Sequence, residues 1–347
     1  MQRKKMKLRD WETETPENTT PLVSVCCTTF QHVNYIRDAI EGFLNQAVNF
    51  SVEIIIRDDA STDGTATIVE EYATKYPSVI RPILNKENLW TKGVSPMRDC
   101  MSYAQGKYIA VCEGDDYWTD PNKLQRQVDF LEANKEYVIC SHRYKVFNEE
   151  TKEWKPDYGH SLFAENIEGI EFDNDFNLNK DWLTKTMTVV FRKECLDLPT
   201  LCKYQYARDI HIYYHLLKIG KGYCMNYDAA VYRQHLGGVH SLISEYNRIV
   251  AHYKLFSELY LKNKKDDVLN RLLLYYKDLF YCDIINKLAE EKYSKSLRLD
   301  IKYFLKTEYS LEGLRVCKYS LKFLLPIMKS LVKKTIPQKT TSCNPQS

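Results

Sequence analysis

The feature that most constrains the fold is a regular alternation of short apolar runs with amphipathic segments. Apolar runs that read as strands lie at 22–27, 52–57, 79–84, 108–112, 137–147 and 186–192. Segments with helical periodicity lie at 33–46, 65–76, 96–105 and 121–134, and another helix is expected after Asp209. Strand and helix in alternation build parallel sheets with helices on their faces. The sequence therefore predicts an α/β fold with a mainly parallel central sheet flanked by helices.

The character of the chain changes at both ends. Residues 1–20 are polar, and we expect them to form a flexible segment ahead of a domain at 21–240. The region 241–347 is rich in Tyr, Leu and Lys with apolar residues on helical spacing, which predicts a C-terminal helical extension. No acid follows Glu312, while basic residues recur to the end, so this region finishes in a basic tail.

Composition narrows the cellular setting. The basic N-terminus lacks a following apolar core, so no signal peptide is expected, and no apolar run reaches the length of a spanning helix. The 11 cysteines include no C-x-x-C pair, which favours buried free thiols in a reducing compartment. A net charge of +3 gives no sign of nucleic-acid binding. We expect a cytoplasmic protein whose basic tail is available for weak peripheral contact with the inner face of a membrane.

Two of the predicted strands end in clustered acids. Asp58 and Asp59 follow the isoleucines of "VEIIIR", and Glu113, Asp115 and Asp116 follow "YIAVC". The carboxyl ends of parallel strands meet at one edge of a sheet, where ligands bind. Clustered carboxylates repel one another unless a cation or a hydrogen-bond donor lies between them. The pattern predicts a site for Mg²⁺ or Mn²⁺, ions that prefer oxygen ligands and accompany substrate phosphates.

Each acidic cluster has a simpler explanation when it is taken alone. Residues 58–64 could form a turn followed by a helix cap, and residues 113–116 could form an acidic loop ahead of a helix. The presence of both clusters in one alternating α/β chain favours a binding site over either explanation.

The same segments resemble a known family. "VSVCCTTF", "IIIRDDASTDGT", "GVSPMRDCMSYAQGKYIAVCEGDDYW" and "NKLQRQVDFLE" are similar to the successive signatures of glycosyltransferase family 2, and the resemblance extends over about 21–240. It implies the Rossmann-like GT-A fold and an inverting enzyme of polysaccharide biosynthesis. Such an enzyme moves a hexosyl or N-acetylhexosaminyl group from a nucleotide-diphospho-sugar, here favoured as a UDP-sugar, to a glycan or lipid-linked acceptor.

The resemblance also implies roles for residues on the nucleotide side. Thr28 and Phe30 match positions that pack against the nucleotide base. Asp59 matches the carboxylate that accepts a hydrogen bond from the base, and Asp58 would support the turn or the ribose. Arg98 falls where the family places an arginine near the donor.

Further roles follow for the metal and phosphate side. "EGDD" occupies the D-x-D position of the family, which makes Asp115 the metal ligand and places Asp116 close to the donor sugar or ribose. Glu113 departs from the usual aspartate, and its longer side chain would reach the metal, a metal-bound water or a ribose hydroxyl. In "VYRQHLGGVHS", the resemblance implies that Arg233 contacts phosphate and that His235 completes the metal environment.

Asp209 is the implied catalytic base. It lies in "YARDIHIYYHLLKIGKG", which matches the segment that carries this carboxylate in the family. An inverting transfer needs one carboxylate to deprotonate the acceptor hydroxyl. An aspartate ahead of a helix is also a common N-cap, and the two roles are compatible.

Two other classes of function stay open at this stage. A nucleotidyltransferase also uses acid-bound metal, but it would need a glycine-rich basic loop after the first strand, and "CCTTFQHVNY" lacks one. A non-catalytic scaffold that binds nucleotide-sugars is disfavoured because all of the implied acids are present.

Overall fold

The computed structural model describes residues 5–13, 20–164, 166–179, 182–205, 208–238, 244–289 and 299–300, with backbone alone at 12–13, 179 and 281–289. These residues form two compact units by their internal contacts. The first comprises Met1–Arg248 with Asp266–Leu272, and the second comprises Ile249–Lys265 with the chain from Leu273. The predicted domain boundaries at 20 and 240 stay predictions.

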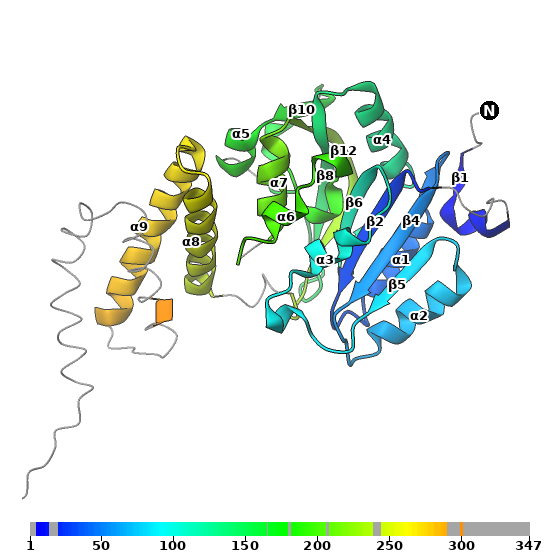
Figure 1. The fold of residues 1–347 in the computed structure, drawn as a ribbon, viewed down its shortest axis with the longest axis horizontal. Helices are drawn as coiled ribbons and strands as arrows, with labels where there is room; N and C mark the ends of the chain where they lie inside the picture. Colours follow the sequence, from blue (N-terminus) through cyan, green and yellow to red (C-terminus); the bar gives the residue numbers. More distant parts are fainter. Residues whose placement is uncertain are drawn as a thin grey trace, which may run out of the picture. The chain divides into compact units, whose positions relative to one another are not determined.

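A mixed sheet of ten strands forms the centre of the first unit within the described residues (Figure 1). Its parallel part consists of β5 (Ile80–Leu84), β4 (Val52–Asp58), β2 (Val23–Thr29) and β6 (Tyr108–Glu113), in this spatial order. The sheet continues through the antiparallel β11 (Val190–Arg192) to the parallel pair β8 (Tyr137–Asn148) and β12 (Lys221–Gln234). The antiparallel edge strands are β7 (Tyr117–Trp118), β9 (Trp154–Pro156) and β10 (Gly169–Phe172).

Helices cover both faces of this sheet because each strand buries side chains on both sides. Cys27 and Ile56 belong to a core with α1 (Ile36–Leu44), α2 (Thr65–Lys75) and α4 (Lys123–Ala133). The alternate side chains, Cys26 and Ile55, belong to a second core, whose helices are α3 (Pro96–Ser102), α6 (Leu198–Leu201) and α7 (Asp209–Leu217). Helix α5 (Asn174–Asn179) follows β10. The two cores are what the period-2 alternation of side chains in a buried parallel strand requires.

The predicted α/β fold with a mainly parallel central sheet is confirmed. The strands and helices expected between 22 and 134 are all present, with small shifts of their ends. The expected strand at 186–192 is shorter, because Thr186–Thr188 form the 3-10 turn η4, in which the Thr188 hydroxyl donates to the carbonyl of Lys185 at 2.7 Å. Strand β12, the longest in the sheet, was not predicted.

Part of the predicted flexible N-terminal segment is packed against the domain. Residues 5–13 contain β1 (Met6–Lys7), which pairs with β3 (Ala47–Val48), and the 3-10 helix η1 (Leu8–Thr13). The side chains of Leu8 and Trp11 are buried in the core that contains α1. Their burial removes apolar surface from water and anchors this part of the segment.

The second unit consists mainly of α8 (Glu245–Lys262) and α9 (Asp267–Ala289), as the sequence predicted for this region. The helices meet through aromatic rings: His252 and Phe256 stack on Tyr276 with centroids 4.8 and 5.2 Å apart. No helix among the described residues is long and apolar enough to cross a membrane. The basic tail lies outside the described residues.

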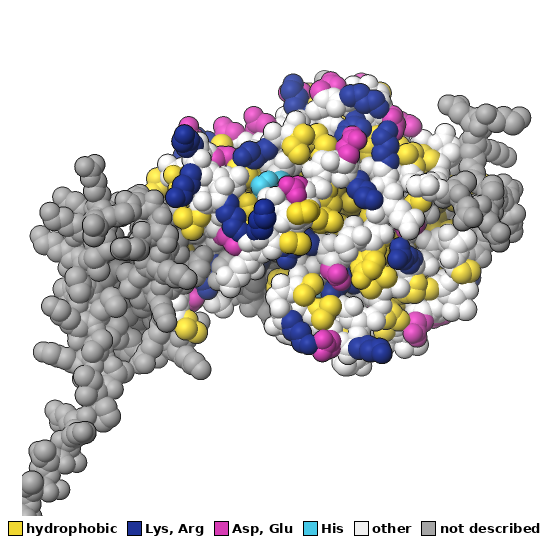
Figure 2. Space-filling view, viewed as in Figure 1, with side chains coloured by type: hydrophobic (Ala, Val, Ile, Leu, Met, Phe, Trp, Pro, Cys, Tyr) yellow, Lys and Arg dark blue, Asp and Glu magenta, His cyan; other side chains and the backbone are white. Residues whose placement is uncertain are grey.

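The surface carries charges of both signs. On the face that Figure 2 shows, basic and acidic side chains are interspersed, which agrees with a net charge of only +3.

All cysteines in the described part of the chain are free thiols, and most of them are buried. This agrees with the prediction that they act as small apolar side chains.

Lys123, the first residue of α4, is a fully buried amine. Its Nζ lies 4.1 Å from the centroid of the Trp118 ring and donates to Gln127 Oε1 at 2.8 Å. Burial lowers the pKa of Lys123 from its ordinary 10.5 to about 7. Between these two values the unfolded chain binds more protons at this position than the folded one, so the amine makes stability rise with pH.

We expect the wild-type protein to gain about 2 kcal/mol of unfolding free energy from Lys123 between pH 7 and pH 9. Lys123→Met removes the titrating group, so its stability relative to wild type should fall by this amount over the same interval. Urea unfolding of both proteins at the two pH values measures the change. Lys86→Met, at an exposed lysine, is the control that keeps the wild-type pH dependence. Equal pH dependence in Lys123→Met and wild type would mean that the buried amine stays charged.

Candidate functional site

The two predicted acidic clusters lie at the same edge of the sheet. Strand β2 lies between β4 and β6, and their pairing aligns Thr29 with Asp58 and Thr28 with Glu113. The three strands are parallel, so their carboxyl ends, and the loops that follow them, lie at the same edge of the sheet (Figure 1). Sequence patterning predicted this convergence, because the strand ends of a parallel sheet define its ligand edge.

The cluster after β6 is crowded with carboxylates. One oxygen each from Glu113, Asp115 and Asp116 lie within 4.8 Å of one another. Burial, followed by the charges of Asp115 and Asp209, raises the pKa of Glu113 to about 8, although Thr186 Oγ1 donates to Glu113 Oε2 at 3.0 Å. Three carboxylates in one buried site cannot all stay ionised without a compensating charge.

Asp116 is the most deeply buried of the three. Its Oδ1 accepts a hydrogen bond from the backbone N–H of Arg233 at 2.8 Å. Its Oδ2 is buried and has no hydrogen-bond partner within the described residues. Burial, followed by the charges of Asp115 and Glu113, raises the pKa of Asp116 well above its usual range. A buried carboxylate oxygen without a partner is a position that favours a bound cation or a ligand hydroxyl.

Two histidines lie close to Asp115. His235 Nε2 lies 3.2 Å from Asp115 Oδ2, and His32 Nε2 lies 3.7 Å from the same oxygen. Burial alone would raise the pKa of Asp115, but the hydrogen bond from His235 and the charges of both histidines lower it. His32, Asp115 and His235 therefore form a second group of potential metal ligands that shares Asp115 with the carboxylates.

Sequence reasoning missed His32. The residue stands in the loop between β2 and α1, at the same strand-end edge as the acids. A histidine just after a strand that ends at the ligand edge is the signal that could have identified it. Both groups fit a divalent cation, because each brings three ligand atoms within 4.8 Å and because Asp116 Oδ2 lacks a partner.

Arg233 is held by protein groups on several sides. It forms ion pairs with Asp38 (Nη2 to Oδ2, 2.7 Å) and Glu149 (Nε to Oε1, 2.8 Å). Its Nη1 donates to the carbonyl of Asp115 at 2.9 Å, and its guanidinium lies over two tyrosine rings at 4.9 and 4.7 Å. The side chain is 5% exposed. These contacts make Arg233 a residue that positions the Asp115 loop, and its implied contact with phosphate stays a prediction.

Asp58 holds the turn after β4. Its Oδ1 accepts from the backbone N–H of Ser61 at 2.9 Å, and its Oδ2 accepts from the Ser61 hydroxyl. Ala60, inside this turn, has a φ of 65°, a left-handed conformation that costs a residue with a Cβ some free energy. The contacts of Asp58 agree with the turn-supporting part of its implied role.

Asp59 fixes the loop after β5. Its Oδ1 accepts from Asn85 Nδ2 and from the N–H of Leu89, both at 3.0 Å, and its Oδ2 accepts from the N–H of Trp90 at 3.1 Å. Burial would raise the pKa of Asp59, but these bonds and the nearby Arg57 lower it. Asp59 Oδ2 has one recorded donor and Oδ1 has two, so Oδ2 is the oxygen that can accept the implied hydrogen bond from a nucleotide base. That bond stays a prediction.

The other residues implied in donor binding, Thr28, Phe30 and Arg98, have no recorded side-chain hydrogen bond or ion pair with the acids within the described residues. Thr28 is half-buried at the end of β2, and Phe30 just beyond it is 42% exposed. Arg98, in α3, donates through Nη1 to the carbonyl of Leu201 in α6. Their implied contacts with base and donor stay predictions. Trp90, which the sequence analysis did not select, donates its backbone N–H to the buried Asp59 carboxylate, and the residue is 51% exposed.

Asp209 is the first residue of α7, and Arg208 is its N-cap, so Asp209 does not take the capping role. Its carboxylate has no recorded hydrogen bond or ion pair within the described residues. Its charge contributes to raising the pKa of Glu113, and it does the same for Tyr213 after the larger effect of burial. Asp209 and Glu113 are therefore close enough to interact electrostatically. A carboxylate at the start of a helix is also stabilised by the helix dipole.

Comparisons with known proteins agree with this site. Residues 24–197 match the family described as Glycosyl transferase family 2. An uncharacterised protein of Mycobacterium bovis is 44% identical over 128 residues, which are 37% of this chain and 36% of that protein. The glucosyltransferase WfaP of Escherichia coli is 34% identical over 124 residues, 35% of this chain and 46% of its own length. The matched segment thus spans less than half of each of these relatives.

A solved structure shares the fold. The S. aureus protein TarS, crystallised as residues 1–349 with UDP-GlcNAc, aligns with a TM-score of 0.56 at 15% sequence identity. The alignment covers 83% of this chain and 81% of the TarS chain. The predicted GT-A fold is thereby confirmed.

Arg233→Met should destabilise the protein by about 2–3 kcal/mol, because it leaves the carbonyl of Asp115 without its donor and removes one of the two cations that pair with Glu149. The midpoint of urea unfolding measures this loss. Arg37→Met is the matched control: Arg37 pairs with Glu71 at 2.8 Å, but both side chains are about half exposed or more. That variant should change stability by less than about 0.5 kcal/mol. Similar losses in the two variants would contradict the positioning role of Arg233.

Proposed function

Because this chain belongs to glycosyltransferase family 2, we propose that it transfers a sugar from a nucleotide-diphospho-sugar to a hydroxyl of a glycan or lipid-linked acceptor, with inversion at the anomeric carbon. The observation that carries the proposal is the meeting of two groups of metal-type ligands at Asp115, with Asp209 close enough to influence Glu113. A site that couples a cation-binding cluster with a separate free carboxylate suits the transfer of a group from a diphosphate leaving group.

Asp209 is the proposed general base. Its carboxylate has no competing partner within the described residues, so it is available to accept a proton. As the acceptor oxygen forms its bond to the anomeric carbon, its proton passes to Asp209, and the bond between that carbon and the diphosphate oxygen breaks. A correctly placed base of this kind contributes about 10²–10⁴ in rate.

A divalent ion is the proposed cofactor. Asp115 would hold it together with His32 and His235, or with Glu113 and Asp116. When bound, the ion neutralises the charge that develops on the diphosphate. Imidazole nitrogens suit transition metals, whereas carboxylates suit Mg²⁺ and Mn²⁺. A mixed set that includes two histidines therefore favours Mn²⁺ over Mg²⁺.

UDP is the proposed nucleotide, and a lipid-linked glycan is the proposed acceptor class. The relative WfaP is named as a UDP-Glc:alpha-D-GlcNAc-diphosphoundecaprenol beta-1,3-glucosyltransferase, and TarS was crystallised with UDP-GlcNAc. These names support a UDP-sugar donor here, with Asp59 and Trp90 near the base. A lipid-linked acceptor also agrees with a weak membrane contact through the basic tail after Glu312, which lies outside the described residues.

The test is hydrolysis and binding of UDP-, GDP-, dTDP- and CMP-sugars with Mn²⁺, Mg²⁺ or EDTA. We expect metal-dependent turnover of one UDP-sugar by wild type. Asp209→Asn should keep donor binding but lose at least about 10²-fold in kcat, because the base is removed. Asp115→Ala should lose metal-dependent donor binding. Absence of nucleotide-sugar binding by wild type under every condition would instead favour a non-catalytic protein.

The histidines supply a separate prediction. His32→Ala and His235→Ala should each weaken Mn²⁺ binding by at least about tenfold, because each removes a nitrogen ligand. Titration calorimetry with Mn²⁺ alone measures the affinity without donor or turnover. His160→Ala, at an exposed histidine, serves as the control that keeps wild-type affinity. If only the variants of Glu113 and Asp116 lost affinity, the ion would bind to the carboxylates instead.

A further inference from the structure

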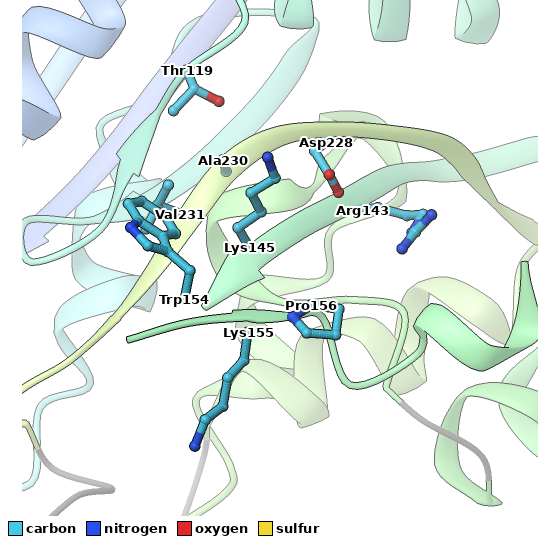
Figure 3. A pocket seen from close by; sticks show the side chains of 9 residues that line it. All are labelled: Thr119, Arg143, Lys145, Trp154, Lys155, Pro156, Asp228, Ala230 and Val231. Atoms are coloured by element: carbon cyan, nitrogen blue, oxygen red, sulfur yellow. The ribbon is translucent and has the colours of Figure 1, made fainter. Parts of the chain in front are cut away.

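A second concave region lies on the extension of the sheet formed by β8, β9 and β12. This groove has a volume of about 640 Å³ and is lined by side chains that include Arg143, Lys145, Trp154, Asp228 and Val231 (Figure 3). None of these residues has a role in the proposed transfer. Its volume lies within the range of small-molecule and oligosaccharide sites.

None of the acids of the cluster at Glu113, Asp115 and Asp116 lines this groove. Side chains alternate along a strand, so Arg143 and Lys145 point to the opposite side of β8 from Tyr144. Tyr144 packs edge-on against Tyr232, with centroids 6.5 Å apart. The groove is therefore distinct from the site of the proposed transfer.

Its aromatic surface is exposed yet fixed. Trp154 is 55% exposed, an unusual exposure for so large an apolar side chain. It packs against Phe147 with centroids 4.6 Å apart and an interplanar angle of 38°. Both residues lie on paired strands, β9 and β8, which limits the movement of the indole. A rigid half-exposed indole is a preformed surface for the apolar face of a sugar ring.

Charged groups line the groove beside this ring. Lys145 is exposed and makes no recorded ion pair or hydrogen bond within the described residues. Arg143 pairs with Asp157 through Nε at 2.9 Å and donates through Nη1 to Asn226 at 3.1 Å, and its Nη2 has no recorded hydrogen bond within the described residues. Asp228 lies between the two basic side chains in Figure 3. The groove thus combines two cationic donors with one acceptor.

The position of Asp228 depends on an irregularity in the sheet. The pairing of β12 with β8 shifts register between Met225 and Asp228, and again between Asp228 and Val231. Such bulges re-aim side chains and recur beside functional sites. Here β12 is an inner strand, flanked by β10 and β8, where regular pairing would be the default.

We propose that this groove binds a negatively charged segment of the acceptor glycan. A pyranose ring would stack on Trp154, its carboxylate or phosphate would pair with Lys145, and Asp228 would accept hydrogen bonds from ring hydroxyls. The identification of the ligand as the acceptor rests on the proposed function. The groove would hold the acceptor chain at a distance from the reacting hydroxyl and so raise its local concentration at the transfer site.

The test is titration calorimetry of the full chain with trigalacturonic acid, without donor or metal. We expect wild type to bind this anionic trisaccharide, and Lys145→Gln and Trp154→Ala each to weaken the affinity at least tenfold. Lys86→Gln is the control, because Lys86 is an exposed lysine that does not line the groove, and it should bind like wild type. Circular dichroism of each variant verifies its folding.

Two further ligands distinguish binding through the sugar rings from binding through the negative charge. The neutral trisaccharide cellotriose should bind at least fivefold more weakly than trigalacturonic acid, and inorganic phosphate more weakly still. No binding of trigalacturonic acid at millimolar concentration, or equal binding by wild type and both groove variants, would overturn the proposal. The titration needs neither donor nor metal, so it is independent of the test of the proposed function. If wild type hydrolysed no nucleotide-sugar, the proposed function would be refuted, and the binding of trigalacturonic acid to the groove could still be measured.

Discussion

The desolvation of carboxylates at one edge of the sheet is the constraint on which the surrounding structure depends. Parallel strands bring the ends of β4 and β6 together, and both ends carry acids. Burial, followed by the charges of neighbouring acids, raises the pKa of Glu113 and of Asp116. The loops at this edge are consequently built from cations and donors that offset the charge. Arg57, fully buried between Asp59 and Asp99 at 3.1 and 2.6 Å, is one example.

The same electrostatic need connects segments that are far apart in the chain. Arg233, near the end of β12, reaches Asp38 in α1, Glu149 just after β8 and the carbonyl of Asp115. His235, two residues further on, reaches the side chain of Asp115. The geometry of the metal-type ligands is therefore set by the C-terminal strand of the domain as much as by the acidic loop itself. Breaking a contact on β12 would disturb ligand positions more than 100 residues earlier in sequence.

Sequence reasoning succeeded where one local pattern decides the structure. The runs that became β2, β4 and β6 are apolar on both faces, so they had to be buried strands, and helical segments separate them. It failed for β12, because "KGYCMNYDAAVYRQ" contains polar residues and bulges that break the period-2 pattern. The contact of Arg233 with phosphate stays a prediction, and its ion pairs come from distant segments that no local pattern reveals.

The sequence by itself determined the parallel α/β core, the edge at which its acids gather and the membership of the glycosyltransferase family, because these depend on residue period and on motifs that are contiguous in the chain. Only the tertiary structure decided that His32 joins Asp115 and His235. It also decided that Asp59 accepts a hydrogen bond from the backbone of Trp90. The groove that Trp154 and Lys145 share with Asp228 is likewise a product of the tertiary structure. These arrangements depend on the twist, register and bulges of the sheet, which sum many weak contacts and leave no signature in any short segment.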